Sequence, residues 1–167
     1  MTNGERTADD AVILEPGAGP ALWFLRNRLT VKATAEQTGG FSLFEYELPP
    51  GSSPPLHVHR REEEAFYVLE GVFTMRCGDR TFTAEPGAFL LLPRDVPHSF
   101  VVEGDKAARM LTILTPGHGL GFFTDNGTVP TDAGLPPLTP VDQAALAAAA
   151  AEYGVDIIGP PLQPFGI

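Results

Sequence analysis

The residues with the clearest capacity for chemistry are two histidines, His57 and His59, in a segment rich in β-forming residues. Side chains at positions i and i+2 of a strand point to the same face, so both imidazoles can aim at one point. A carboxylate follows at Glu64, and a third imidazole, His98, follows a second β-rich block. Three imidazoles and one carboxylate suit one divalent transition metal ion, and Fe, Ni, Co, Mn, Cu and Zn all fit.

The carboxylate of this set has three candidates, because Glu62, Glu63 and Glu64 are consecutive. Glu64 shares strand parity with Phe66 and Val68, whereas Glu62 and Glu63 fall in the expected turn, where glutamates are commonly solvated. We therefore predict Glu64 as the ligand, and a β-bulge near the turn would favour Glu63 instead.

Four protein ligands leave one or two positions open on an octahedral ion, which water, dioxygen or a bidentate substrate can fill. Each ligand histidine also needs an acceptor for its other ring nitrogen, and the sequence does not identify these acceptors.

Proline-rich corners precede the candidate ligands. Residues 49–55 contain four prolines and a glycine just before His57, and Pro93 and Pro97 bracket the corner before His98. Proline cannot donate to a β-ladder, so these corners belong at a rim or an edge of the sheet.

The rest of the chain predicts many short strands joined by turns. About ten are expected, and such a pattern is typical of an all-β sandwich or barrel. They lie at residues 21–25, 29–34, 41–48, 56–59, 64–69, 72–77, 80–84, 88–92, 98–102 and 107–115. The run Ala88–Leu92 is apolar throughout, so we expect it to be covered on both faces.

We divide the chain into three parts. Residues 1–20 form an N-terminal arm that is partly disordered or exchanged between subunits, with residues 1–10 frayed. Residues 21–116 form the barrel. Residues 117–167 form an extension that packs on it, with a short helix at 119–126, an alanine-rich helix at 142–153 and an extended tail.

Composition limits the partners. The chain has 21 acidic and 11 basic residues, a net charge of -10, and no cluster of lysine and arginine that would attract nucleic acid. Cys77 is the single cysteine, which excludes an intrachain disulfide and a cysteine-rich zinc site. An acidic N-terminus and the absence of a long apolar run argue against a signal peptide and a membrane span, so we expect a cytoplasmic protein.

At this point the sequence resembles the cupin superfamily. The first cupin motif corresponds to Gly51, His57, His59, Glu64 and Gly71, and the second to Gly87, Pro93, Asp95, His98 and Val102. The family prefers glycine at the position of Asp95 and asparagine at that of Val102, but neither is a metal ligand, and aspartate tolerates positive φ in a turn. The resemblance implies a single jelly-roll (double-stranded β-helix) barrel, a metal held by His57, His59, Glu64 and His98, and commonly a homodimer. The apolar run Val12–Leu14 is a candidate contact element for such a dimer.

The segment from Leu114 to Phe123, the alanine-rich helix and the segment from Tyr153 to Pro161 resemble small bacterial cupins of the quercetin-dioxygenase-like type. That resemblance implies a dioxygenase for a phenolic or enolic, flavonol-like molecule, with Glu64 taking a proton from a substrate hydroxyl. Apolar residues expected to line the barrel favour an aromatic or apolar substrate; they are Phe44, Tyr46, Phe66, Phe73, Met75, Phe89 and Phe100.

Three alternatives stay open. The first is a non-oxidative cyclase, isomerase or lyase that uses the metal as a Lewis acid. The second is a cupin that binds a small ligand without turnover, and the third is a structural barrel without metal. His118, between two glycines, is expected to be a surface or loop residue.

Overall fold

The computed structural model describes residues 11–164, so the prediction of frayed residues 1–10 and the last three residues of the predicted tail lie outside the described range. The elements in chain order are β1 (Ala21–Phe24), β2 (Asn27–Ala33), α1 (Ala35–Thr38), β3 (Ser42–Leu48), β4 (Pro55–His59), β5 (Glu63–Glu70), β6 (Phe73–Cys77), β7 (Arg80–Ala84), β8 (Phe89–Leu92), β9 (His98–Val102), β10 (Ala108–Thr115), α2 (Leu120–Asn126), α3 (Gln143–Glu152) and β11 (Val155–Pro161).

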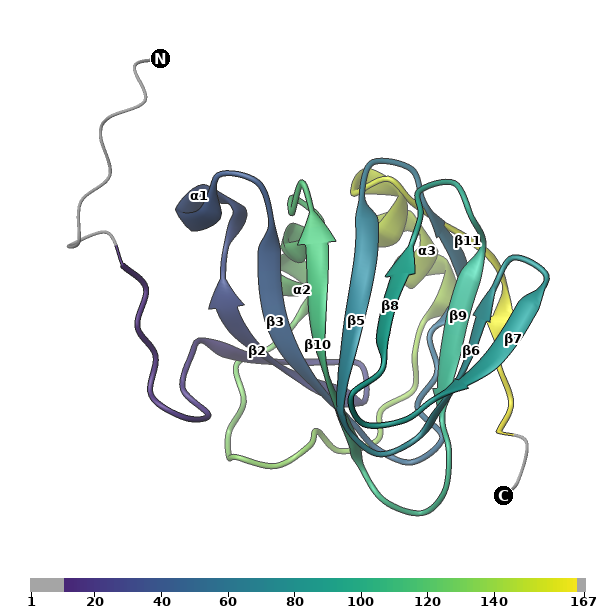
Figure 1. Cartoon of the computed structure of the whole chain (residues 1–167), viewed down its shortest axis with the longest axis horizontal. Helices are drawn as coiled ribbons and strands as arrows, with labels where there is room; N and C mark the ends of the chain where they lie inside the picture. The colour runs from purple at the N-terminus through teal and green to yellow at the C-terminus, as the bar shows by residue number, and fades with distance from the viewer. Residues whose placement is uncertain (1–10, 165–167) are drawn as a thin grey trace.

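The strands form two antiparallel sheets. One has the order β1-β2-β3-β10-β5-β8, and the other has the order β11-β4-β9-β6-β7. Neighbours in each sheet are often distant in sequence, as the pairing of β3 with β10 shows, and this arrangement is a jelly roll. Figure 1 shows the two sheets side by side, with α2 and α3 behind the strands of the larger one. The predicted all-β fold is therefore confirmed.

The core lies between the two sheets. Strand β3 alternates strictly between buried and half-buried residues, and β10 does the same until its last residue, so each contributes one face to the core. The largest fully buried apolar side chains come from both sheets: Phe44, Phe66, Phe73, Leu29, Leu48, Met75, Met110 and Leu114.

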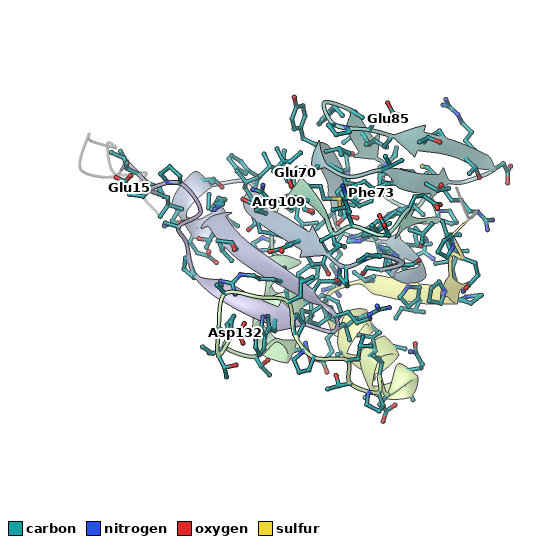
Figure 2. All side chains as sticks on the ribbon, turned by 90° about the horizontal axis from the view of Figure 1, so that it is seen from below. Glu15, Glu70, Phe73, Glu85, Arg109 and Asp132 are labelled. Carbon is teal, nitrogen blue, oxygen red and sulfur yellow. The ribbon has the colours of Figure 1, made fainter. Side chains whose placement is uncertain are left out.

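Ion pairs join the strands of the large sheet on its outer face. Arg109 of β10 lies between Glu45 of β3 and Glu70 of β5 and donates to both carboxylates. Figure 2 shows Arg109 beside Glu70, with Phe73 placed among the strands. Such pairs at a partly exposed surface contribute little individually, but they match the register of three adjacent strands.

One expectation about the strands is wrong. The run Ala88–Leu92 is not covered on both faces, because in β8 Phe89 is 62% and Leu91 54% exposed, whereas Leu90 and Leu92 are buried. The physical reason is that β8 is an edge strand of the large sheet and only one of its faces meets the core. Phe89 therefore does not line the barrel, unlike the other six aromatic and methionine side chains predicted to do so.

The segment after β10 returns to the barrel. Helix α3 begins after Asp142, whose side chain accepts hydrogen bonds from the backbone N–H groups of Ala144 and Ala145. Strand β11 then pairs with β4 through Val155 opposite His59 and Ile157 opposite His57. The C-terminal segment thus adds a strand directly beside the two histidines.

Among residues 11–164, no helix is both long and apolar enough to cross a membrane.

Candidate metal centre

The four predicted ligands come together from three strands. His57 and His59 lie on β4, Glu64 lies on β5, and His98 opens β9. His57 and His98 are opposite each other in the β4–β9 pairing, which explains how two motifs far apart in sequence reach one point. The donor atoms of all four residues lie within 4.8 Å of one another.

The spacing fits one ion. Donor atoms bound to one metal at about 2.1 Å can be at most ~4.2 Å apart, so small side-chain movements suffice to close the cluster. Oε2 of Glu64 lies 3.3 Å from Nε2 of His98 and 3.7 Å from Nε2 of His59. The imidazole centroids are 4.5 to 5.3 Å apart. Glu64 therefore occupies the carboxylate position, and Glu63 is not part of the cluster.

Backbone carbonyls fix the orientation of two rings. Nδ1 of His57 lies 2.7 Å from the carbonyl oxygen of Pro55, and Nδ1 of His98 lies 2.9 Å from that of Val96. A carbonyl only accepts, so each Nδ1 carries the hydrogen and each Nε2 presents a lone pair to the cluster. Nε2 of His98 is buried and makes no hydrogen bond of good geometry. This orphaned buried atom is the observation that a bound metal explains.

The electrostatics keep the ligands in their metal-binding forms. Burial, together with the neighbouring histidines, lowers the pKa of His57 to about 3, and burial also lowers the pKa of His59. Burial alone would raise the pKa of Glu64, but the surrounding His59, His98 and His57 lower it to about 2. Neutral imidazoles and an ionised carboxylate are the forms that donate lone pairs to a cation. The residues present therefore fit a divalent transition ion.

Comparison with known proteins agrees with the fold. Residues 44–114 match the cupin domain family. The chain carries a cupin domain. A solved structure described as a predicted oxalate decarboxylase from Thermotoga maritima aligns with a TM-score of 0.56, covering 62% of this chain and 97% of that one. At 19% identity this similarity concerns the cupin fold alone.

This chain aligns with only part of the length of each curated relative. Quercetin 2,3-dioxygenase of Bacillus subtilis is 31% identical over 116 residues, which are 69% of this chain and 34% of that protein. Protein SchB of Streptomyces halstedii is 35% identical over 53% of this chain and 63% of its own length. Polyketide synthase CurC of Streptomyces cyaneus is 35% identical over 55% and 58%. The chain therefore spans between about a third and two thirds of these relatives.

The departure from the cupin pattern at Asp95 has a structural explanation. Asp95 adopts a φ of 63°, the left-handed conformation for which cupins prefer glycine, as its tolerance of such a turn predicted. Its backbone N–H donates to the carbonyl of His59 at 2.9 Å. Its carboxylate pairs with Arg60, which also binds Asp156 of β11. Arg60 thereby joins the two cupin motifs.

Glu62 is a residue beside the site whose burial and contacts sequence reasoning missed. It was expected in a solvated turn, but it is 3% exposed. Its Oε1 accepts hydrogen bonds of 2.8 Å from the backbone N–H groups of both Gly117 and Gly119. These glycines lead into α2, whose Phe122 and Phe123 line the cavity beside the metal cluster. Glu62 therefore ties the start of β5, which carries Glu64, to the aromatic wall of the cavity.

The cupin barrel opens into one cavity that reaches the cluster. Its volume is about 420 Å³, and its wall includes His57, His59 and Glu64. Most of the wall is apolar: Phe24, Phe66, Phe100, Phe122, Phe123, Val141, Leu146, Val155, Ile157 and Leu162. Helix α3 and β11 contribute to this wall, so the C-terminal segment shapes the cavity. His118, in contrast, is exposed, as expected.

A chain of polar side chains crosses one part of the cavity wall. The Ser52 hydroxyl donates to Oδ1 of Asn27 at 2.7 Å, and Nδ2 of Asn27 donates to the Tyr46 hydroxyl at 3.0 Å. All three residues are buried. Burial raises the pKa of Tyr46 well above its usual range, so the phenol keeps its hydrogen.

Proposed function

We propose that this protein is a metal-dependent cupin enzyme, a dioxygenase for a phenolic or enolic, flavonol-like small molecule. The observation that carries the proposal is the position of the His57, His59, Glu64 and His98 cluster in the wall of an apolar cavity of about 420 Å³. A cavity of this size and lining accepts an aromatic ligand of a few rings. The similarity to quercetin 2,3-dioxygenase supports the same class of substrate.

The residues have separate roles in this proposal. His57, His59, Glu64 and His98 hold the metal, which when bound supplies open positions for a substrate oxygen and for dioxygen. Glu64 accepts the proton of the substrate hydroxyl, because its carboxylate is ionised and faces the cavity. Phe66, Phe100, Phe122 and Phe123 surround the aromatic body and exclude water.

A second candidate is non-oxidative chemistry at the same site, in which the metal acts as a Lewis acid in a cyclisation or isomerisation. The similarity to polyketide synthase CurC favours this candidate, because it covers a larger share of that relative than the similarity to the dioxygenase does. Both functions need the same four ligands, but only the dioxygenase consumes dioxygen. Measurement of dioxygen uptake therefore distinguishes them.

The test begins with elemental analysis of the protein purified without added metal and after reconstitution with Fe, Ni, Co, Mn, Cu and Zn. An oxygen electrode then measures uptake with 3-hydroxyflavone, quercetin and catechol. We expect about one ion per chain and dioxygen uptake that is lost in His98→Ala. Protein that binds no ion under any of these conditions contradicts the enzyme proposal, and bound metal without dioxygen uptake favours the Lewis-acid candidate.

We also propose that the protein forms a homodimer through the outer face of β5 and β8. Tyr67 and Phe89 are opposite each other in the β5–β8 pairing and are 42% and 62% exposed, and Leu91 beside them is 54% exposed. An exposed apolar face on an edge strand is self-complementary under a two-fold axis. Light scattering should give a dimer mass for the wild type and a monomer mass for Phe89→Glu, with Val129→Glu, another exposed site, as the control.

A further inference from the structure

The turn between β1 and β2 reaches the cavity. It consists of Leu25 and Arg26, and both residues line the cavity wall. Leu25 has a φ of 55°, a left-handed conformation that costs a bulky residue about 1–2 kcal/mol. Glycine is the usual residue at the first position of such a tight turn. The chain accepts this strain in a turn that places Arg26 at the cavity.

Arg26 has no acceptor among the residues that the structure describes. Its Nε is buried and makes no hydrogen bond. Arg28, two residues later on the same hairpin, instead donates to the carbonyl of Asp132. A buried N–H without a partner costs about 1–3 kcal/mol, and a ligand that supplies an acceptor recovers this free energy. A guanidinium is suited to a planar anionic group such as a carboxylate.

Tyr46 supplies a second free donor in the wall of the same cavity. In the polar chain described above, Asn27 donates to the oxygen of Tyr46, so this oxygen is the acceptor and the phenolic hydrogen is left to donate. Arg26, Asn27 and Tyr46 all line this cavity, so both free donors are open to one ligand. Ser52 fixes the direction of the chain, because its hydroxyl donates to the amide oxygen of Asn27.

The charges that line the cavity favour an anion. Arg26 is the one lysine or arginine among the described lining residues, and Glu64 is the one aspartate or glutamate. A dication at the cluster outweighs the charge of Glu64, and Arg26 adds to the positive potential inside a chain whose net charge is -10. Walls of low polarity strengthen this potential, so an anionic ligand is drawn to the cavity.

We propose that Arg26 and Tyr46 bind a carboxylate of the ligand. This carboxylate is separate from the enolic group of the same ligand, which lies at the metal cluster. This inference rests on the proposed function and narrows its substrate class to aromatic acids that carry an enolic or phenolic hydroxyl. The metal cluster selects the hydroxyl, the phenylalanines select the ring system, and the two donors select the acid group.

The test is calorimetric titration of nickel-loaded protein, without dioxygen, with 3-hydroxyflavone and with its 3′-carboxylate and 4′-carboxylate derivatives. We expect at least one carboxylate to bind about 10–100-fold more tightly than the parent compound, as a charge-assisted hydrogen bond allows. In Arg26→Gln this preference should fall to near one. In Tyr46→Phe the preference should fall partially.

Arg28→Gln is the matched control, because it removes the same charge from the same hairpin at a residue that is not in the described cavity wall and that donates to Asp132. It should keep the full preference. If neither carboxylate gains over the parent compound, or if Arg26→Gln and Arg28→Gln reduce the preference equally, the inference is overturned. If carboxylates bind through Arg26 and the parent compound does not bind at all, the inference holds and the proposed enolic function fails. If none of the three compounds binds, both fail.

Discussion

The carboxylate of Glu62 and the backbone of Gly119 are in direct contact, although the two residues are 57 positions apart in the sequence. The N–H of Gly119 donates to Oε1 of Glu62, and a Cβ at Gly119 would lie 2.0 Å from Oε2. An added Cβ would therefore force this carboxylate to move away from its hydrogen-bond donors. The contact holds the loop that leads to the aromatic wall of the cavity.

This contact predicts a coupled pair of substitutions. Gly119→Ala should destabilise the fold by about 2–4 kcal/mol, because the buried carboxylate is displaced from its two N–H donors. In a Glu62→Ala background the same change should cost less, with a coupling energy of about 1–3 kcal/mol. Chemical denaturation of the four proteins of this cycle measures it. Gly40→Ala, at a site with no atom within 4 Å of the added Cβ, serves as the control, and strict additivity contradicts the contact.

Metal binding should stabilise the folded protein. A ligand present at a hundred times its dissociation constant adds about 2.7 kcal/mol, so an added transition ion should raise the melting temperature of the wild type by several degrees. His98→Ala removes a buried donor from the cluster and should abolish this increase. His118→Ala, which changes an exposed histidine outside the cluster, should keep the full increase. An equal response in both variants contradicts the assignment of the cluster.

The stability of the metal-free protein should depend on pH. Burial first, and then the neighbouring histidines, lower the pKa of His57 from 6.5 to about 3, so the unfolded chain binds the proton more readily than the folded one. The contribution of the neutral His57 imidazole to stability is therefore complete above about pH 6.5 and is lost as the pH falls toward 3. Glu64, lowered from 4.5 to about 2, acts in the same direction below pH 4.5. Thermal unfolding between pH 4 and 8 measures this loss, which should be smaller in His57→Asn. An apo protein that gains stability on acidification contradicts the buried neutral imidazole.

Gly71, the last glycine of the first cupin motif, should not tolerate a side chain. It has a φ of 82°, and an added Cβ would lie 2.5 Å from the Cβ of Ala108. Gly71→Ala should cost about 2–4 kcal/mol from steric overlap and strain together. Gly104→Ala has a similar φ of 76° but no neighbour within 4 Å, so it should show the strain alone, about 1–2 kcal/mol. The difference between the two unfolding free energies measures the overlap, and equal values contradict it.

Local periodicity was sufficient to predict part of the site. The i, i+2 spacing of His57 and His59 and the strand parity of Glu64 depend only on the strand repeat, and the structure brings these three residues together with His98. The ring acceptors at Pro55 and Val96 are two residues before their histidines, but only the backbone geometry of each corner shows that the carbonyls turn inward.

Long-range contacts account for what the sequence did not predict. The partners of Glu62 lie at Gly117 and Gly119, and no periodic pattern connects a glutamate to a loop that far along the chain. The exposure of Phe89 depends on β8 being the last strand of its sheet, which is a property of topology rather than composition. The free donors of Arg26 and Tyr46 become visible only once the hairpin is seen against the cavity.

The pairing of β11 with β4 has a consequence for the order in which the protein is made. Strand β4 meets β9 in a single residue pair, His57 with His98, whereas β11 runs along it from Pro55 to His59. Since β11 is synthesised after every other described strand, the segment that carries two of the three histidines gains its main neighbour last. During synthesis the strand that carries His57 and His59 can therefore gain its pairing with β11 only after the other described strands have emerged.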